Sequence, residues 1–135
     1  MMLLDTHVLI WLAEGMDVLP LPSRELIDEA AGATGLAISS ISFWEIAMLD
    51  SRGRISLSQP IAEWHRRVLS APGVTEVPVT GEVGIEAVLL PGRLHGDPAD
   101  RMLLATARLN GWRLATRDRR LLKYGALGHV RTVEV

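Results

Sequence analysis

Four acidic residues lie where apolar stretches of this sequence give way to expected helices. Asp5 ends the apolar run of residues 1–4 at the N-terminus. The other three lie at the expected start of a helix or end of a strand: Glu45, Asp100 and Asp118. In an α/β domain, strand ends and helix starts meet at one edge of the sheet, where ligands bind. Because four carboxylates gathered there repel one another unless a divalent cation lies among them, the pattern predicts a metal-dependent hydrolase.

Local helix chemistry offers a structural explanation for several of these acids. Ser42 and Glu45 have the spacing of a capping box, in which the glutamate reaches back to the amide of the cap residue. Asp97 precedes a proline and suits an N-cap. Asp100 and Asp118, in expected first turns, are favoured by the helix dipole. Each of these features alone is compatible with a purely structural role.

The expected directions of the side chains favour a metal site instead. Asp5 falls between a buried strand and an amphipathic helix, which places it at the rim of the sheet. Asp100 shares a helix face with Leu103 and Ala107, so it begins a stripe that faces the core. Glu45 lines up with an apolar stripe in the same way. A carboxylate aimed inward is costly unless it is paired or coordinates a metal, and four of them together favour the metal.

The ligand chemistry predicts which metal and which substrate class. Ligands that are all carboxylate oxygens select a hard cation, Mg²⁺ or Mn²⁺, over zinc. The histidines are scattered along the chain and form no helical metal pair: His7, His65, His95 and His129. Mg²⁺ held by carboxylates keeps several waters and binds substrate oxygens, so we expect a phosphate ester as the substrate.

Composition is that of one ordinary domain covering residues 1–135, with 48% hydrophobic and 22% charged residues. The chain has no cysteine, which excludes disulfides and thiolate metal sites. The apolar N-terminus lacks the basic region of a signal peptide, and no apolar stretch is long enough for a membrane helix. We therefore expect a cytoplasmic protein that does not bind membranes.

Arginines supply nearly all of the positive charge, although the net charge is −2. They occur in local groups, among them Arg66 with Arg67 and the four arginines at positions 113, 117, 119 and 120. A planar guanidinium binds two phosphate oxygens at once, so these groups suit a nucleic acid. Arginine pairs on helix surfaces are also common as solvated faces.

Strand and helix signals alternate along the whole chain. Strands are expected at residues 1–4, 36–39, 74–79, 112–115 and 129–135, and helices at 6–14, 23–33, 42–52, 60–69, 80–89, 97–110 and 118–124. We expect Thr6, Ser23 and Ser42 to cap three of these helices. Strands that alternate with helices of this length pair in parallel with helices on both faces. The fold class is therefore α/β, a three-layer α/β/α sandwich.

These motifs resemble the PIN domain family, and in particular the VapC-type toxins of toxin–antitoxin pairs. The matching segments occur in the family's order and span nearly the whole chain: residues 3–7, 42–47, 95–103, 105–107 and 114–118. The resemblance implies a five-stranded parallel sheet with the acids at the carboxyl ends of its strands. It assigns metal binding and catalysis to Asp5, Glu45, Asp100 and Asp118.

The resemblance also implies roles for four neighbouring residues. The hydroxyls of Thr6 and Thr116 would serve a second shell around the metal or contact a phosphate oxygen. Asp97 would help to orient water or Asp100. Arg101 would pair with a carboxylate or meet the substrate, and both alternatives remain open.

The activity implied by the resemblance is endonucleolytic cleavage of RNA by metal-activated water. The family also implies a homodimer and a small antitoxin partner. The antitoxin lays a helix across the apolar surface of the first helices and covers the acids. Trp11 and Leu12 are candidates for that surface, and core packing is the alternative for both.

Other classes of protein fit the sequence less well. A signalling receiver-like domain needs two adjacent acids after the first strand, whereas Asp5 stands alone. A phosphatase with two aspartates separated by one residue is excluded because position 7 is His7. A catalytically silent PIN-like domain that binds RNA or a partner is expected to lack at least one of the four acids, and it remains the alternative.

Overall fold

Five short strands form one parallel sheet in the computed structural model, which describes residues 1–135. The strands are β1 (Met2–Leu4), β2 (Leu36–Ser39), β3 (Val74–Val77), β4 (Arg113–Thr116) and β5 (Arg131–Glu134). Their order is β3-β2-β1-β4-β5, and every neighbouring pair is parallel. The first strand therefore lies at the centre, between β2 and β4. The expectation of a five-stranded parallel sheet is confirmed.

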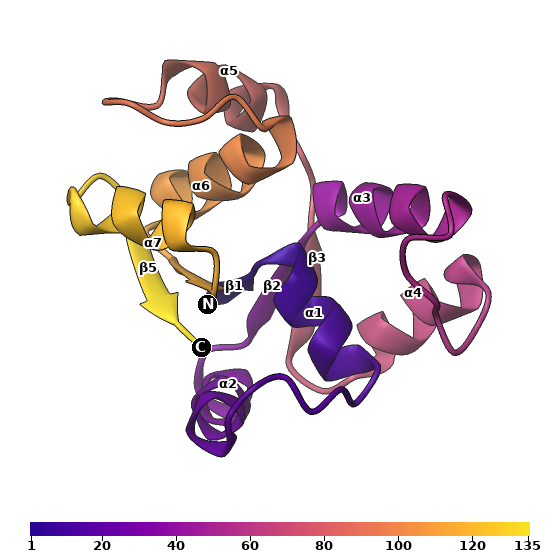
Figure 1. Cartoon of the computed structure of the whole chain (residues 1–135). Helices are drawn as coiled ribbons and strands as arrows, with labels where there is room; N and C mark the ends of the chain where they lie inside the picture. Colours follow the sequence, from indigo (N-terminus) through magenta and orange to yellow (C-terminus); the bar gives the residue numbers. More distant parts are fainter.

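Seven helices connect these strands (Figure 1). They are α1 (Thr6–Ala13), α2 (Leu21–Ala33), α3 (Ser40–Ser51), α4 (Ile61–Ser70), α5 (Gly81–Leu89), α6 (Pro98–Asn110) and α7 (Arg119–Ala126). In Figure 1, α5, α6 and α7 lie together on one side of the strands, whereas α1, α3 and α4 lie on the other. No helix has the length and apolar character needed to cross a membrane.

Alternation along β1 divides the core into two layers. Met2 and Leu4 pack in the cluster that includes α1, α2 and α4. Leu3, between them, packs in the cluster that includes α6 and α7. Successive side chains of a strand point to opposite faces, so a strand that is apolar at every position must be covered on both sides. The three-layer sandwich expected from the sequence is confirmed.

Two helix starts differ from the expected ones at the carboxyl edge of the sheet. Asp5, not Thr6, is the N-cap of α1, and its carboxylate accepts a hydrogen bond from the Thr6 amide. Ser39, not Ser42, is the N-cap of α3, and its hydroxyl accepts from the Ile41 amide. Both prediction errors have one cause: each helix begins immediately at the strand end, without an intervening loop.

Other boundaries move by a few residues for local reasons. Helix α2 begins at Leu21 behind Pro20, so Ser23 is not its cap. Strand β3 stops at Val77 because Pro78 has no amide hydrogen to donate. Strand β4 begins one residue later than expected, because the Trp112 amide donates to the Ala107 carbonyl and so completes the end of α6.

Candidate functional site

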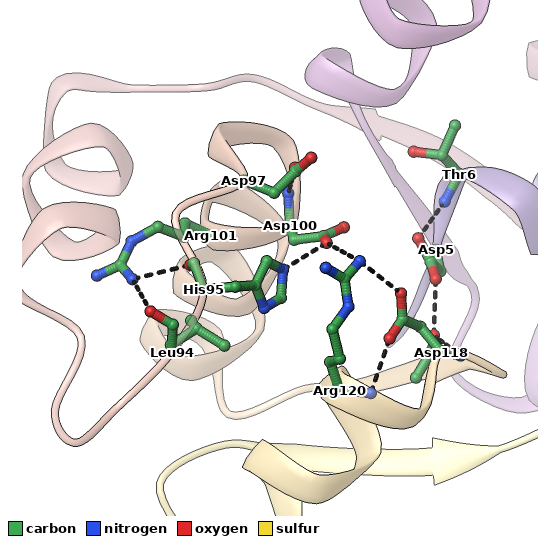
Figure 2. A network of polar contacts seen from close by, with 10 residues as sticks. Asp5, Thr6, Leu94, His95, Asp97, Asp100, Arg101, Asp118 and Arg120 are labelled. Carbon is green, nitrogen blue, oxygen red and sulfur yellow. Dashed lines mark hydrogen bonds and ion pairs between the residues drawn. The ribbon is translucent and has the colours of Figure 1, made fainter.

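Three of the four predicted acids lie close together at the carboxyl edge of the sheet (Figure 2). Asp5 follows β1 directly, and Asp118 follows the adjacent strand β4 as the N-cap of α7. Asp100 lies in the first turn of α6. The negative charge of Asp118 acts to raise the pKa of Asp5, and the charge of Asp5 acts to raise the pKa of Asp100. The edge where ligands bind in open α/β sheets therefore carries an acidic cluster.

Asp5 is the buried member of the cluster, with only 8% of its surface exposed. Its Oδ1 accepts from the Thr6 amide at 2.8 Å, and its Oδ2 accepts from the Thr116 hydroxyl at 2.6 Å. Burial raises the pKa of Asp5, while these two hydrogen bonds act to lower it. The repulsion of Asp118 adds to the rise in the pKa of Asp5. The carboxylate is thus rigidly held in an environment that disfavours its charge.

Both threonines named from the sequence donate to Asp5, Thr6 through its backbone amide and Thr116 through its hydroxyl. Thr116 is fully buried, donates to Asp5 and accepts from the Asp118 amide at 3.0 Å. Thr6 is also fully buried, and its hydroxyl donates to Ser42 Oγ at 2.9 Å. These contacts join the ends of β1 and β4 to helix α3. The Thr116 hydroxyl therefore holds Asp5 directly, whereas the Thr6 hydroxyl contacts Ser42 and not an acid.

Asp100 points into the site with 16% of its side chain exposed. His95 Nε2 lies 2.8 Å from Asp100 Oδ2, and the Asp97 carboxylate caps α6 by accepting from the Asp100 amide at 2.9 Å. Burial raises the pKa of Asp100 to about 6, against the lowering effect of the hydrogen bond from His95. The charges of Asp97 and Asp5 also act to raise the pKa of Asp100. The N-cap predicted at Asp97 is therefore confirmed, and it holds the first turn of α6, on which Asp100 lies.

Asp118 faces a cation rather than open solvent. Arg120 donates to Asp118 through its backbone amide at 2.8 Å and through its guanidinium at 3.3 Å. The same guanidinium nitrogen lies 3.8 Å from Asp100 Oδ2. Partial burial acts to raise the pKa of Asp118, but the hydrogen bonds and charge of Arg120 outweigh it, so the pKa of Asp118 lies below its ordinary value.

Glu45 is half-buried on α3 and forms no ion pair with a basic residue. The capping-box explanation for Glu45 is wrong, because α3 begins at Ser40 and Ser42 is a buried residue inside the helix. Helix α3 packs against α1 and α6, the helices that carry Asp5 and Asp100 at their starts. Glu45 therefore has no local structural role that accounts for it.

Arg101 donates to main-chain carbonyls and not to a carboxylate, which was the first of the two contacts weighed from the sequence. Its guanidinium donates to the carbonyls of Ala87 at 2.8 Å, His95 at 3.3 Å and Leu94 at 3.4 Å. These bonds fasten the segment between α5 and α6 to the start of α6. Arg101 therefore fixes the backbone that carries His95, which in turn contacts Asp100.

The acids fit a hard cation in chemical type, because Asp5, Asp100 and Asp118 are carboxylates at one rim and repulsion among acids acts to raise the pKa of Asp5 and of Asp100. Their positions do not form a complete ligand set, since no group of three His, Asp or Glu side chains is placed to hold a metal ion. Protein donors contact oxygens of Asp5, Asp100 and Asp118. A cation that bound these oxygens would have to displace some of those donors.

Sequence reasoning missed two residues that contact the acids, His95 and Arg120. The histidines were considered only as metal ligands, whereas His95 acts on Asp100 from a loop five residues upstream. Arg120 was considered only as one of several arginines that suit phosphate. Its position two residues after Asp118, at the start of a helix, was the available signal, because an N-cap carboxylate and a following side chain share the first turn.

A separate apolar hollow of about 370 Å³ opens on the layer formed by α1, α2 and α4. Its walls include Leu9, Leu12, Ile27, Val68 and Val74. None of the four acids lines it, and Trp11 does not line it either. The Trp11 ring instead lies 6.0 Å from the guanidinium carbon of Arg117, the residue before Asp118. Leu12 therefore lies in the wall of the hollow, whereas Trp11 lies beside Arg117.

Comparison with known proteins agrees with the fold and the order of the motifs. The family model described as "PIN domain" matches residues 2–127. Ribonuclease VapC22 from Mycobacterium tuberculosis (strain ATCC 25618 / H37Rv) is 40% identical over 119 residues, which cover 88% of each chain.

Solved structures share the architecture at lower sequence identity. A chain of the crystal structure of VapBC2 from Rickettsia felis, bound to a DNA fragment from its promoter, superposes with a TM-score of 0.72 at 14% identity, covering 98% of this chain and 97% of that one. A chain of a toxin–antitoxin complex from Klebsiella pneumoniae gives a TM-score of 0.66 at 21% identity, with coverage of 98% and 96%. The family resemblance inferred from the motifs is confirmed: the chain belongs to the PIN domain family.

Proposed function

We propose that this chain is a Mg²⁺- or Mn²⁺-dependent endoribonuclease, the toxin of a VapBC-type toxin–antitoxin pair, acting in the cytoplasm as a single domain of residues 1–135. The observation that carries the proposal is the cluster of Asp5, which is buried, with the partly buried Asp100 and Asp118 at the ligand-binding edge of a PIN fold. The relative named Ribonuclease VapC22 supports RNA as the substrate.

In this proposal, the metal ligands are Asp5, Glu45, Asp100 and Asp118. A divalent cation supplies Lewis-acid chemistry, which activates water and stabilises negative charge on a phosphodiester. The protein contributes placement, since Thr116 fixes the position of Asp5 by a hydrogen bond. No histidine or nucleophilic side chain is required as a base, which suits a site whose inner residues are carboxylates and hydroxyls.

His95, Asp97 and Arg101 act together on Asp100 in this account. Arg101 holds the carbonyl of His95, His95 contacts the Asp100 carboxylate, and Asp97 caps the helix turn on which Asp100 lies. Partners of this kind orient a ligating carboxylate before the metal arrives. Arg101 is therefore proposed to be a positioning residue and not an RNA contact.

The apolar hollow is the proposed seat of the antitoxin. It is open, mostly hydrophobic and bounded by α1, α2 and α4, which matches the partner surface implied for the first helices. One of the superposed structures, from Klebsiella pneumoniae, is described as a toxin–antitoxin complex. Leu12 belongs to this surface, whereas Trp11 lies beside Arg117. An amphipathic helix laid in such a groove is a common mode of recognition.

The homodimer expected from the family is proposed to form through α5. Ile85, Val88 and Leu89 on this helix are exposed by 64%, 75% and 68%. Three adjacent apolar side chains with that exposure are unusual for a helix that faces only water. Helix α5 packs on α6, so a dimer formed there leaves the hollow beside α1 free for the antitoxin.

Cleavage of total cellular RNA by the antitoxin-free protein tests the proposed function. We expect discrete fragments with Mg²⁺ or Mn²⁺ and none with a chelator. Asp100→Asn and Asp5→Asn should lower the rate by roughly a hundredfold or more, because each removes a ligand charge. Asp28→Asn, an exposed position on α2, is the matched control and should cleave like the wild type.

Two results would contradict this prediction in different ways. A cleavage rate of Asp100→Asn equal to that of the wild type would contradict the assignment of Asp100 to the catalytic site. No cleavage, together with no rise in melting temperature on addition of metal, would support the catalytically silent binding module instead.

Asp100→Asn should also stabilise the metal-free protein at neutral pH. The pKa of Asp100 is about 6 in the folded protein, above its ordinary value of 3.8, so the folded state binds the proton more tightly than the unfolded state. This contribution to stability is present below the unfolded pKa and is lost as the pH rises through about 6. We expect a melting temperature roughly 3–5 °C above the wild type near pH 7.5, the effect of about 1 kcal/mol in a domain of this size. The difference should shrink towards pH 5, and a variant less stable at both pH values would show that the site does not disfavour the charge.

Leu12→Arg should weaken antitoxin binding while RNA cleavage by the free protein stays unchanged. A charge placed in the apolar hollow removes one contact and buries an unpaired guanidinium, which we expect to raise Kd by about tenfold or more. The control is Leu21→Arg, at a residue of α2 that is 66% exposed and lies outside the hollow. Titration calorimetry with the cognate antitoxin measures both affinities. Equal affinities for the two variants would place the antitoxin elsewhere.

Val88→Glu should convert the proposed dimer to a monomer, because two copies of the charge would meet in an apolar contact. Light scattering coupled to size-exclusion chromatography gives the mass directly. Leu127→Glu, exposed by 59% after α7, is the control and should leave the dimer intact. A wild-type protein that is monomeric at high concentration, or a dimeric Val88→Glu, would remove α5 from the interface.

A further inference from the structure

Arg120 places a positive charge among the acids of the candidate site, and the inference drawn from it rests on the function proposed above. One guanidinium nitrogen of Arg120 lies 3.3 Å from Asp118 Oδ2 and 3.8 Å from Asp100 Oδ2 (Figure 2). Asp118 and Asp100 come from different elements, the N-terminus of α7 and the first turn of α6. A single cation therefore bridges two of the carboxylates proposed to hold the metal.

The backbone fixes Arg120 at this position without fixing its side chain. The Arg120 amide donates to Asp118 Oδ1 at 2.8 Å, which ties the first turn of α7 to the acid. The side chain itself is 62% exposed and contacts the acids from the solvent side. Exposed ion pairs of this kind are weak, so the guanidinium can leave the acids at small cost.

The neighbouring arginines are committed elsewhere. Arg119 lies 3.3 Å from Glu134, and Arg117 donates to the Val18 carbonyl at 2.9 Å. Arg101 donates to main-chain carbonyls. His95 approaches Asp100 from the partly buried side, at 2.8 Å. Of these arginines, Arg120 alone has its guanidinium within ion-pair distance of Asp100 and Asp118.

We propose that Arg120 is a built-in competitor of the divalent cation, which occupies Asp100 and Asp118 in the metal-free protein and leaves them when the metal binds. The oxygen that faces Arg120 on each carboxylate is unavailable to a metal as long as the guanidinium stays. The guanidinium keeps the clustered acids from repelling one another before metal arrives, at the expense of metal affinity.

Calorimetric titration of the chelator-treated, full-length protein with Mn²⁺ tests the proposal without reference to catalysis. Arg120→Gln removes the charge and keeps a shorter polar side chain. We expect it to bind Mn²⁺ about two- to fivefold more tightly than the wild type, the range that exposed ion pairs provide. Arg120→Lys keeps the charge and should stay close to the wild type.

The matched control is Arg119→Gln, which removes the same charge one residue away. Arg119 pairs with Glu134 and is 82% exposed, so its loss changes net charge without opening the acids. Equal gains in affinity for Arg119→Gln and Arg120→Gln would reduce the effect to net charge and overturn the proposal. Unchanged or weaker Mn²⁺ binding by Arg120→Gln would overturn it as well.

A second readout follows the guanidinium itself. The Arg120 Nε–H resonance of ¹⁵N-labelled wild type, assigned by its absence in Arg120→Lys, should move on titration with Mg²⁺ towards the position of a solvated arginine. A resonance that stays in place while Mg²⁺ saturates the site would contradict displacement. If neither the wild type nor any variant binds Mn²⁺ or Mg²⁺, the proposed function fails together with this inference; if all bind equally, only this inference fails.

Discussion

The hydrogen bond from the Thr116 hydroxyl to Asp5 joins the ends of two adjacent strands, and the arrangement of the rim depends on it. Asp5 ends the central strand with 8% of its surface exposed, so its charge needs nearby donors. Thr116 supplies one at 2.6 Å, and at the same time accepts from the Asp118 amide. A single buried hydroxyl therefore sets the distance between two acids that are 113 residues apart in the sequence.

Hydrogen bonds also hold Asp100 and Asp118, which are both more exposed than Asp5. Asp100 is oriented by His95 and by the Asp97 cap, while Asp118 is held by Arg120. The environment raises the pKa of Asp5 and of Asp100, chiefly through burial, and lowers that of Asp118 through Arg120. A site that keeps carboxylates charged against their surroundings gives up stability for the ability to bind a cation.

The sequence was sufficient to predict the fold class, because apolar runs with no polar alternation require a sheet covered on both faces. It also placed Asp5, Asp100 and Asp118 at one rim. The sequence prediction that Ser42 starts α3 is wrong, because Ser39 satisfies the same local capping rules and is the residue that caps the helix. The choice is tertiary: Ser42 is needed inside the helix to accept from Thr6.

The arginines show the same limit of local reasoning. Arg101 and Arg120 each follow an acid closely in sequence, and nothing in that spacing distinguishes their roles. The fold places Arg101 against the carbonyls of the preceding segment and Arg120 against the carboxylates. Partners contributed by another element, such as the α5 carbonyl for Arg101, cannot be read from either motif.

Anomalous diffraction from crystals of the antitoxin-free protein soaked in Mn²⁺ would test the central claim most directly. The account predicts an anomalous peak between the carboxylates of Asp5, Asp100 and Asp118, within reach of Glu45, with the Arg120 guanidinium turned away from the acids. The absence of a peak at this rim would contradict the proposed metal site. Binding of Mn²⁺ elsewhere, with Arg120 still bridging Asp100 and Asp118, would contradict it as well.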